Sequence, residues 1–297
     1  MIALLGLAFV LGVVAQSRLD VAGTRDALWQ LYFHGLAPIL VLSTFTSIEI
    51  ATSLLQALVA VVVATWLVGA LAYAYGSLVS RDRPEHGALA LTAAFGNTNA
   101  VGLPVAQVAF GLPGLELAVV YDRLAWLVPS NAVSATVARV HSLPAGAGRI
   151  GLSRIFLTNT PLFAMLLALV IRLANVDVPI LDSMGHVVVR IVGPVAFLLL
   201  GLSVPLGRPS HTRDEVQRAL GAVMIRVAGG PLALLAVAQL TSIEVPGVFY
   251  VLAGMPCAFH LLTLGRVYHL RPALIRFCIT VSTSAVLLAV GIGLAIR

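Results

Sequence analysis

The sequence predicts an all-α integral membrane protein with ten transmembrane helices, arranged as two inverted five-helix repeats with broken, crossing helices 4 and 9. Three observations lead to this fold class. Of 297 residues, 60% are hydrophobic and only 10% are charged, whereas a soluble globular domain has about 25% charged residues. The apolar residues form ten segments separated by short polar stretches. Two of these segments, at matching positions in the two halves, are interrupted by glycine and proline.

Each apolar segment is expected to be helical, because unpaired backbone groups inside a bilayer are costly. A helix needs roughly 20 residues to span the hydrocarbon core. The first segment, MIALLGLAFVLGVVAQ, is shorter and has no charged residue before its apolar run. It is therefore expected to be a retained helix and not a cleaved signal peptide. The ten predicted segments are 2–16, 28–48, 54–79, 87–111, 115–139, 154–174, 184–206, 217–240, 246–266 and 273–296.

The orientation of the helices is predicted from arginine, which supplies all 18 basic residues. Arginines occur in every second loop, and positively charged loops stay in the cytoplasm. Both termini are then on the non-cytoplasmic side. Because the arginines lie singly in short loops, the net charge of +6 is read as this orientation signal, and no nucleic-acid partner is expected. The loop arginines are Arg18, Arg25, Arg81, Arg83, Arg139, Arg149, Arg154, Arg208, Arg213, Arg218, Arg266, Arg271 and Arg276.

The longest central loop divides the chain into equal numbers of helices. Residues 1–140 form the first predicted five-helix repeat, residues 141–153 a cytoplasmic linker, and residues 154–297 the second repeat. Because each half has an odd number of helices, the two halves must cross the membrane in opposite senses. Similar stretches in helices 2 and 7, GLAPILVLS and GPVAFLLLGLS, support the repeat.

The interruptions are GNTNAVGLP in helix 4 and GMPCAFH in helix 9. Proline lacks an N–H donor and displaces the carbonyl one turn earlier, so polar side chains, water or a substrate must satisfy the freed backbone. Paired broken helices in inverted halves indicate a substrate site at the bilayer midplane; a single such residue often marks only a kink. The predicted substrate-binding residues are Asn97, Thr98, Asn99, Pro104 and Pro256, with Ser43 and Asn131 as further polar residues of the cavity.

Charged residues inside the predicted helices are candidates for ion coupling, because an idle intramembrane charge is costly. Asp122 and Arg123 are adjacent in helix 5, and neighbouring helical residues face different ways. We therefore expect Arg172 or Arg190 to neutralise Asp122. Two interpretations remain open for Asp122: a proton or cation relay, or a structural ion pair that stabilises the fold.

Histidine and cysteine give weaker indications. His260 follows the second interruption and is suited to proton coupling, although it could equally be a packing residue. Arg226 is expected to extend toward the cytoplasm. Cys257 and Cys278 lie in apolar segments and indicate neither a disulfide nor a metal site. No catalytic motif is present, so neither an enzyme nor a cofactor is predicted. His34 and Ser130 are further candidate cavity residues, and His86, His141 and His211 are expected at the surface.

These stretches resemble the auxin efflux carrier family. GNTNAVGLPVAQVAFG is similar to the family signature, in which an Asn-Thr pair precedes Gly-x-Pro and an apolar run ending in Gly. TNTPLFAMLLALVIR, GPVAFLLLGLSVPLG, LAGMPCAFHLLTLGRVYHL and ITVSTSAVL are similar to its later helices in order and spacing. The resemblance implies a ten-helix secondary transporter, a homodimer formed through scaffold helices, and the inner (plasma) membrane of a bacterium. The third helix has no acidic residue like that of the plant carriers, so auxin itself is not predicted.

The expected function is efflux of a small organic anion by alternating access. Helices 3, 4, 5, 8, 9 and 10 would form the core and helices 1, 2, 6 and 7 the scaffold, with H+ or Na+ as the coupling ion. Two alternatives remain: a sodium-coupled organic-acid symporter of the bile-acid carrier type, and a membrane receptor without transport. Flux in proteoliposomes separates the receptor from either transporter, and sodium dependence separates the two transporters.

Overall fold

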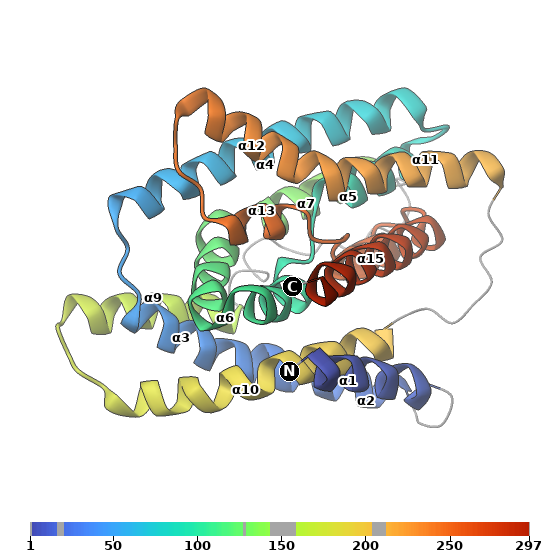
Figure 1. Ribbon diagram of the computed structural model, residues 1–297. Coiled ribbons are helices and arrows are strands. Elements are labelled where there is room, and N and C mark those ends of the chain that lie inside the picture. The colour runs from blue at the N-terminus through green and yellow to red at the C-terminus, as the bar shows by residue number, and fades with distance from the viewer. Residues whose placement is uncertain (1, 17–20, 127–128, 143–158, 204–211, 297) are drawn as a thin grey trace. The chain divides into compact units, whose positions relative to one another are not determined.

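The computed structural model describes residues 2–16, 21–126, 129–142, 159–203 and 212–296 (Figure 1). Over these residues the regular elements are all helices, and the chain forms no strand. Six helices are long and apolar enough to cross a membrane, which is compatible with an integral membrane protein. They are Gly23–Ser47, Thr52–Val79, Thr98–Trp126, Pro179–Ser203, Arg213–Thr241 and Pro272–Gly293; Leu4–Ala15 and Thr160–Leu173 are shorter apolar helices.

Some predicted features lie outside the described residues. These are the central linker from residue 143 onward, the beginning of the sixth predicted segment, Arg18, Arg149, Arg154, Arg208 and His211.

The chain divides into two compact units. Unit 1 comprises Met1–Ile50, Asn99–Arg123 and Ser153–Val204, and unit 2 comprises Ala51–Thr98, Leu124–Leu152 and Pro205–Arg297. Unit 1 thus contains the predicted helices 1, 2, 6 and 7, and unit 2 contains most of the predicted core. Only residues 99–123 depart from the predicted grouping, because they were expected in the core and belong to unit 1.

Unit 1 is built around α10, against which α1, α3 and α6 pack. Glycines allow α1 and α10 to approach closely. A Cβ on Gly12 would lie 2.4 Å from the Leu198 carbonyl oxygen, and one on Gly201 would lie 2.2 Å from the Phe9 carbonyl oxygen. The two helices therefore pack backbone to backbone, as small residues allow in membranes. The elements of unit 1 are α1 (Ile2–Ala15), α2 (Val21–Leu31), the π-helix η1 (Tyr32–Leu36), α3 (Ala37–Ser47), α6 (Leu103–Val120), α9 (Thr160–Leu173) and α10 (Pro179–Ser203).

The predicted break between helices 4 and 5 coincides with a kink in α6. Two helical stretches meet at Gly111, where φ is 72° and ψ is −160°, directly before the loop predicted at residues 112–114. Glycine adopts a positive φ without the steric penalty of a side chain. Pro113 then falls in the first turn after the bend, where its missing N–H would have no helical partner in any case.

Unit 2 is arranged around the short helix α5, which contacts α4, α7, α11 and α15. Its chain leaves helical geometry after α5 and again after α13, within the predicted segments 4 and 9. The elements of unit 2 are α4 (Thr52–Val79), α5 (Arg83–Ala94), the π-helix η4 (Pro129–Val133), α7 (Ser134–His141), α11 (Arg213–Met224), the π-helix η5 (Ile225–Gly229), α12 (Gly230–Thr241), α13 (Gly247–Ala253), α14 (His260–Val267) and α15 (Pro272–Ala295). Two further π-helices, η2 (Thr98–Gly102) and η3 (Tyr121–Trp126), contain the points at which the chain passes from one unit to the other.

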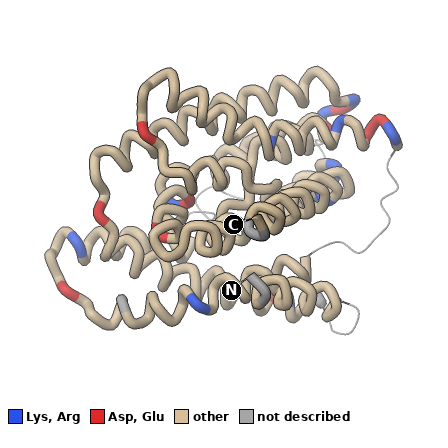
Figure 2. The backbone as a smooth tube through the Cα atoms, in the orientation of Figure 1, with Lys and Arg blue, Asp and Glu red and all other residues tan. Residues whose placement is uncertain are grey.

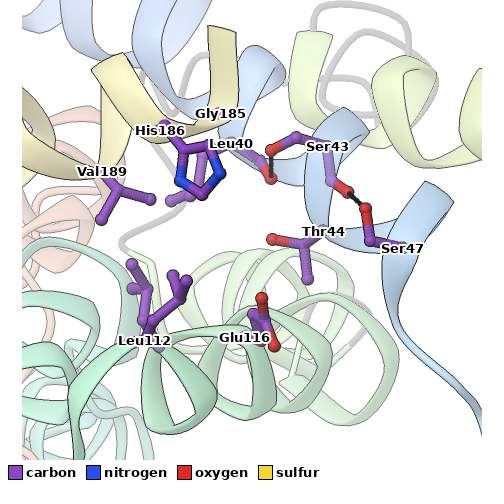
Figure 3. A pocket seen from close by; sticks show the side chains of 10 residues that line it. Leu40, Ser43, Thr44, Ser47, Leu112, Glu116, Gly185, His186 and Val189 are labelled. Carbon is purple, nitrogen blue, oxygen red and sulfur yellow. Dashed lines mark hydrogen bonds between the residues drawn. The ribbon is translucent and has the colours of Figure 1, made fainter. Parts of the chain in front are cut away.

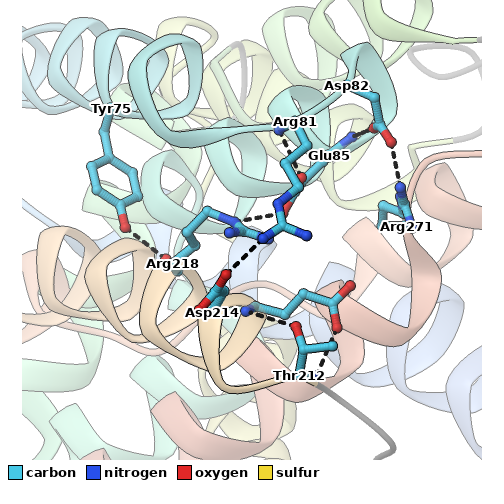
Figure 4. A network of polar contacts seen from close by, with 9 residues as sticks. Tyr75, Arg81, Asp82, Glu85, Thr212, Asp214, Arg218 and Arg271 are labelled. Atoms are coloured by element: carbon cyan, nitrogen blue, oxygen red, sulfur yellow. Dashed lines mark hydrogen bonds and ion pairs between the residues drawn. The ribbon is translucent and has the colours of Figure 1, made fainter.

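Loop arginines tie the ends of the helices in unit 2 together (Figure 4). Glu85 is buried and accepts hydrogen bonds from Arg218 Nε at 2.8 Å and from the Arg81 backbone N–H at 2.9 Å. Asp82 caps the N-terminus of α5 and pairs with Arg271. Burial opposes ionisation of Asp82, but hydrogen bonds from Arg271 and the Glu85 amide outweigh it and lower its pKa. Arg218 and Arg271, which the sequence marks only as orientation signals, thus join α5 to α11 and α15 near helix ends where charged residues gather (Figure 2).

His141 was predicted at the surface, and this prediction is wrong. Its side chain is buried, with its ring centroid 4.3 Å from that of His86 and 5.6 Å from that of Tyr73. Gly87 makes room for it, because a Cβ there would lie 2.6 Å from the His141 Cβ. His86 remains partly exposed, and its pKa is lowered by partial burial and by the neighbouring His141. Gly87 on the neighbouring helix α5 therefore allows His141, which was expected at the surface, to pack inside unit 2.

Gly12→Ala is expected to lower the free energy of unfolding by about 1–3 kcal/mol, the usual cost of overpacking, because its Cβ would meet backbone atoms of α10. Gly6→Ala is the matched control, since Gly6 lies on the same helix with nothing within 4 Å. Alanine there should be neutral or improve helix propensity by up to about 1 kcal/mol. Thermal unfolding of purified protein in detergent measures both, and equal melting temperatures for the two variants would contradict the packing of α1 on α10.

Candidate functional site

The first helix interruption lies at Phe95–Asn97, directly after α5. α5 ends at Ala94, and helical structure resumes with η2 at Thr98. Pro104 was expected to cause the break, but it lies in the first turn of α6, after the chain has become helical again. Proline is well tolerated in a first turn. The break therefore coincides with the Gly-Asn part of the motif and not with its proline.

The second interruption lies between α13 and α14. α13 ends at Ala253, and α14 begins at His260. Pro256 is inside this stretch, as its sequence position predicts. Both Asn97 and Thr98 at the first interruption are buried, so backbone groups at either break need partners from the protein.

The two interruptions supply those partners to each other, and both lie in unit 2. Gly96 and Cys257 form an antiparallel β-bridge. The Asn97 N–H donates to the Pro256 carbonyl at 2.6 Å, and the Ala258 N–H donates to the Phe95 carbonyl at 3.0 Å. The sequence led us to expect side chains, water or substrate in this role. Backbone pairing satisfies the broken ends more directly.

Arg226 stabilises the helix ends on both sides of the bridge. Its Nη1 donates to the Ala94 carbonyl at 2.6 Å and its Nη2 to the Ala253 carbonyl. These are the last residues of α5 and α13, where unpaired carbonyls and the negative end of the helix dipole favour a cation. Arg226 is only 3% exposed, so the prediction that it extends toward the cytoplasm is wrong. Its guanidinium carbon also lies 5.7 Å from the ring centroid of Trp126.

Three further side chains hold the bridge in place. The Trp126 indole N–H donates to the Gly96 carbonyl at 3.2 Å. The Cys257 N–H donates to Ser282 Oγ at 3.1 Å, and the Cys257 thiol donates to the Thr92 carbonyl at 3.1 Å. Sequence reasoning missed Trp126, Ser282 and Thr92, because their helices meet the bridge only through tertiary packing.

Gly96 carries a local signal of this packing. A Cβ at this position would lie 3.3 Å from the Met255 carbonyl oxygen and 3.4 Å from the Arg226 guanidinium. A glycine in an apolar helical segment often marks a close approach of another backbone, which is its role here.

The other half of the Asn-Thr-Asn motif belongs to unit 1. Asn99 Nδ2 lies 3.4 Å from Asp122 Oδ2, and the Tyr32 hydroxyl lies 3.5 Å from the Asn99 carbonyl oxygen. Asp122 pairs with Arg123 at 2.7 Å, and both side chains are buried. Asn99 and Asp122, which are far apart in the sequence, therefore share one polar cluster.

The prediction that Asp122 and Arg123 do not pair is wrong. They lie in the π-helix η3, which turns less per residue than an α-helix, and the long arginine stem reaches back to its neighbour. The two expected partners are engaged elsewhere or exposed. Arg172 donates to the carbonyls of Phe45 and Ile48 at the end of α3, and Arg190 is exposed on α10.

The remaining predicted residues fall into two places. His260 begins α14 and hydrogen-bonds the Ser130 backbone. Asn131 Nδ2 donates to Ser130 Oγ at 3.2 Å, so these three residues share one part of unit 2. Ser43, another predicted cavity residue, lies on α3 in unit 1 and lines a cavity there. His34 is also in unit 1 and contacts Thr160 Oγ1 at 3.0 Å.

Comparison of the chain with protein-family models gives no match, and comparison with curated proteins gives none. Among the described residues, no group of three or more His, Cys, Asp or Glu side chains could hold a metal ion. The site is thus defined by its own geometry: two broken helices paired through their backbones, with a buried arginine at their ends.

Replacing Arg226 is expected to destabilise the protein strongly. Arg226→Met should lower the unfolding free energy by about 2–5 kcal/mol, because two charge-assisted hydrogen bonds of roughly 1.5–3 kcal/mol each are lost while buried carbonyls remain. Arg226→Lys keeps the charge but not the planar fork, so it should recover only part of the loss. Arg276→Met is the control, since Arg276 is exposed on α15. Thermal unfolding in detergent ranks the melting temperatures of the three variants. A wild-type melting temperature for Arg226→Met would refute the capping role.

Proposed function

We propose that the chain is a secondary active transporter for a small organic anion, working by alternating access at paired broken helices. The observation that carries this proposal is the backbone pairing of Phe95–Asn97 with Pro256–Ala258 beside buried Arg226. Helices broken at membrane depth are tolerated where they line a protein interior or a wet cavity. Transporters use such breaks to bind solutes and coupling ions near the midplane.

The proposed architecture has ten helices in two inverted five-helix repeats, in which the broken segments 4 and 9 cross. It rests on the matching positions of the two breaks in the two halves of the sequence. The existence of two compact units supports alternating access, because that mechanism needs separable parts. We place the protein in the plasma membrane. Because arginine-bearing loops stay in the cytoplasm, both termini are then on the non-cytoplasmic side.

The anionic substrate class is supported by positive partial charge after each break. The helical segments that follow the two breaks begin at Thr98 and His260, and a helix N-terminus favours an anion. Asn97 and Thr98 supply neutral polar groups next to one of these ends. We therefore assign them to substrate binding, together with Asn99 at the start of the next segment.

The proposed coupling group is Asp122. Among the described residues, its partner Arg123 has a buried Nε without a hydrogen bond, so the guanidinium retains a donor for an anion. Asp122 also contacts Asn99, which links a titratable carboxyl to the motif of the first break. Protonation of Asp122 would weaken its hold on Arg123 and on Asn99 together.

Asn97→Ala and Asn99→Ala are each expected to slow carboxylate flux by about tenfold, since a hydrogen bond of roughly 1.4 kcal/mol corresponds to that factor. A panel of mono- and dicarboxylates is first ranked by thermal stabilisation of purified protein, with and without sodium. Uptake and efflux of the best compound are then measured in proteoliposomes. Gln56→Ala is the control, because Gln56 is an exposed amide on α4. Wild-type flux by both folded asparagine variants would reject this site.

Asp122→Asn is expected to abolish the pH dependence of flux while keeping the side-chain shape. The double variant Asp122→Asn/Arg123→Met separates coupling from structure, because it removes both charges of the buried pair. If the pair is only structural, the double variant should restore flux together with its normal pH profile. Flux measured as a function of pH decides, with Asp26→Asn on the exposed surface of α2 as control.

A further inference from the structure

Unit 1 contains a cavity of about 270 Å³ between α3, α6 and α10 (Figure 3). Hydroxyl groups of Ser43, Thr44 and Ser47 line its α3 side, Glu116 projects from α6, and His186 from α10. In Figure 3 the Glu116 carboxyl group points from α6 toward the side chains of α3. Ser43, a predicted substrate-binding residue, is one of these hydroxyl groups.

Glu116 is the charge that this cavity leaves without a counter-charge. It lies in the candidate membrane span Thr98–Trp126 and is partly exposed to the cavity. Over the described residues it forms no ion pair and no hydrogen bond. Asp122 in the same span is instead paired with Arg123. A partly buried carboxylate beside an aliphatic wall is costly unless it has a partner, so Glu116 indicates a ligand with positive charge.

The hydroxyl groups favour a ligand that donates hydrogen bonds. Ser43 Oγ donates to the Leu40 carbonyl at 3.1 Å, and Ser47 Oγ donates to the Ser43 carbonyl at 3.0 Å. A hydroxyl has one hydrogen, so while these bonds persist each oxygen can offer a ligand only acceptor lone pairs. Gly185 leaves space for this wall, because a Cβ there would lie 2.7 Å from Ser43 Oγ.

The rest of the wall is aliphatic. Leu112 and Val189 face the cavity (Figure 3), and none of the described residues that line it is an arginine. A bare inorganic cation prefers oxygen ligands on all sides, which this half of the wall does not offer. An anion would meet the Glu116 carboxylate, and neither lysine nor arginine is among the described residues that line the cavity. An ammonium group attached to a short apolar body matches both halves.

We propose that this cavity is a binding site for a small primary ammonium compound. The ammonium pairs with Glu116 and donates hydrogen bonds to the hydroxyls of α3, while the alkyl part contacts Leu112 and Val189. A volume of about 270 Å³ corresponds to roughly nine waters at about 30 Å³ each, which accommodates a short alkylamine. None of the residues that line it is among the transport residues proposed above.

The test is thermal unfolding of the full chain in detergent at pH 8 and constant ionic strength, with n-butylammonium chloride titrated against sodium chloride. We expect a saturable rise in melting temperature with n-butylammonium only. Tetramethylammonium, which has the charge but no N–H donor, should give a smaller rise. Glu116→Gln should weaken the apparent affinity at least tenfold. Glu49→Gln, an exposed carboxyl just beyond α3, should leave it unchanged.

Thr44→Val provides a second variant of nearly equal volume and should weaken n-butylammonium binding several-fold. Equal stabilisation by sodium, or saturable binding that survives in folded Glu116→Gln, would overturn the proposal. A lipid headgroup is a second source of the same ammonium chemistry. Stabilisation by phosphatidylethanolamine in mixed micelles that depends on Glu116, without an effect of n-butylammonium, would identify the headgroup as the ligand. Carboxylate flux in the Asn97 variant reports on transport separately.

Discussion

Hydrogen bonding of backbone groups away from water is the constraint on which the structure of unit 2 depends. Ending α5 at Ala94 and α13 at Ala253 frees carbonyls and amides that lipid cannot satisfy. The bridge between Gly96 and Cys257 pairs the extended residues with each other, and Arg226 covers the two helix ends. Each break thus supplies hydrogen-bond partners for the backbone groups of the other.

A buried arginine suits this position better than any other cation. Burying a charge is costly unless it is hydrogen-bonded, and the two carbonyls and the face of Trp126 surround the guanidinium. Arginine is more weakly hydrated than lysine and presents donors in a planar fork. One side chain can therefore serve two helix ends that point toward it from different parts of the chain. The carbonyls of Ala94 and Ala253, at the negative ends of two helix dipoles, stabilise the charge.

The breaks themselves could be predicted from the sequence, because glycine, asparagine and proline mark them locally. Pro256 lies within its break, whereas Pro104 lies one helical stretch beyond its own, since proline is compatible with a first turn. The pairing of Asp122 with Arg123 was missed because an α-helical geometry was assumed where a π-helix forms. The role of Arg226 could not be read from its neighbours, because its partners are carbonyls 132 and 27 residues away. Local chemistry predicts where a chain stops being helical, and tertiary packing decides what meets it there.

Gly230 shows how the surrounding helices make this arrangement possible. It lies four residues after Arg226, which places both on one face of the helix. A Cβ at Gly230 would lie 2.1 Å from the Ala253 carbonyl oxygen and 2.7 Å from Arg226 Nη2. Any side chain there would push the end of α13 away from the guanidinium. The spacing Arg-x-x-x-Gly thus combines a cation with the space that its carbonyl partner needs, so the capping of α13 requires both residues at once.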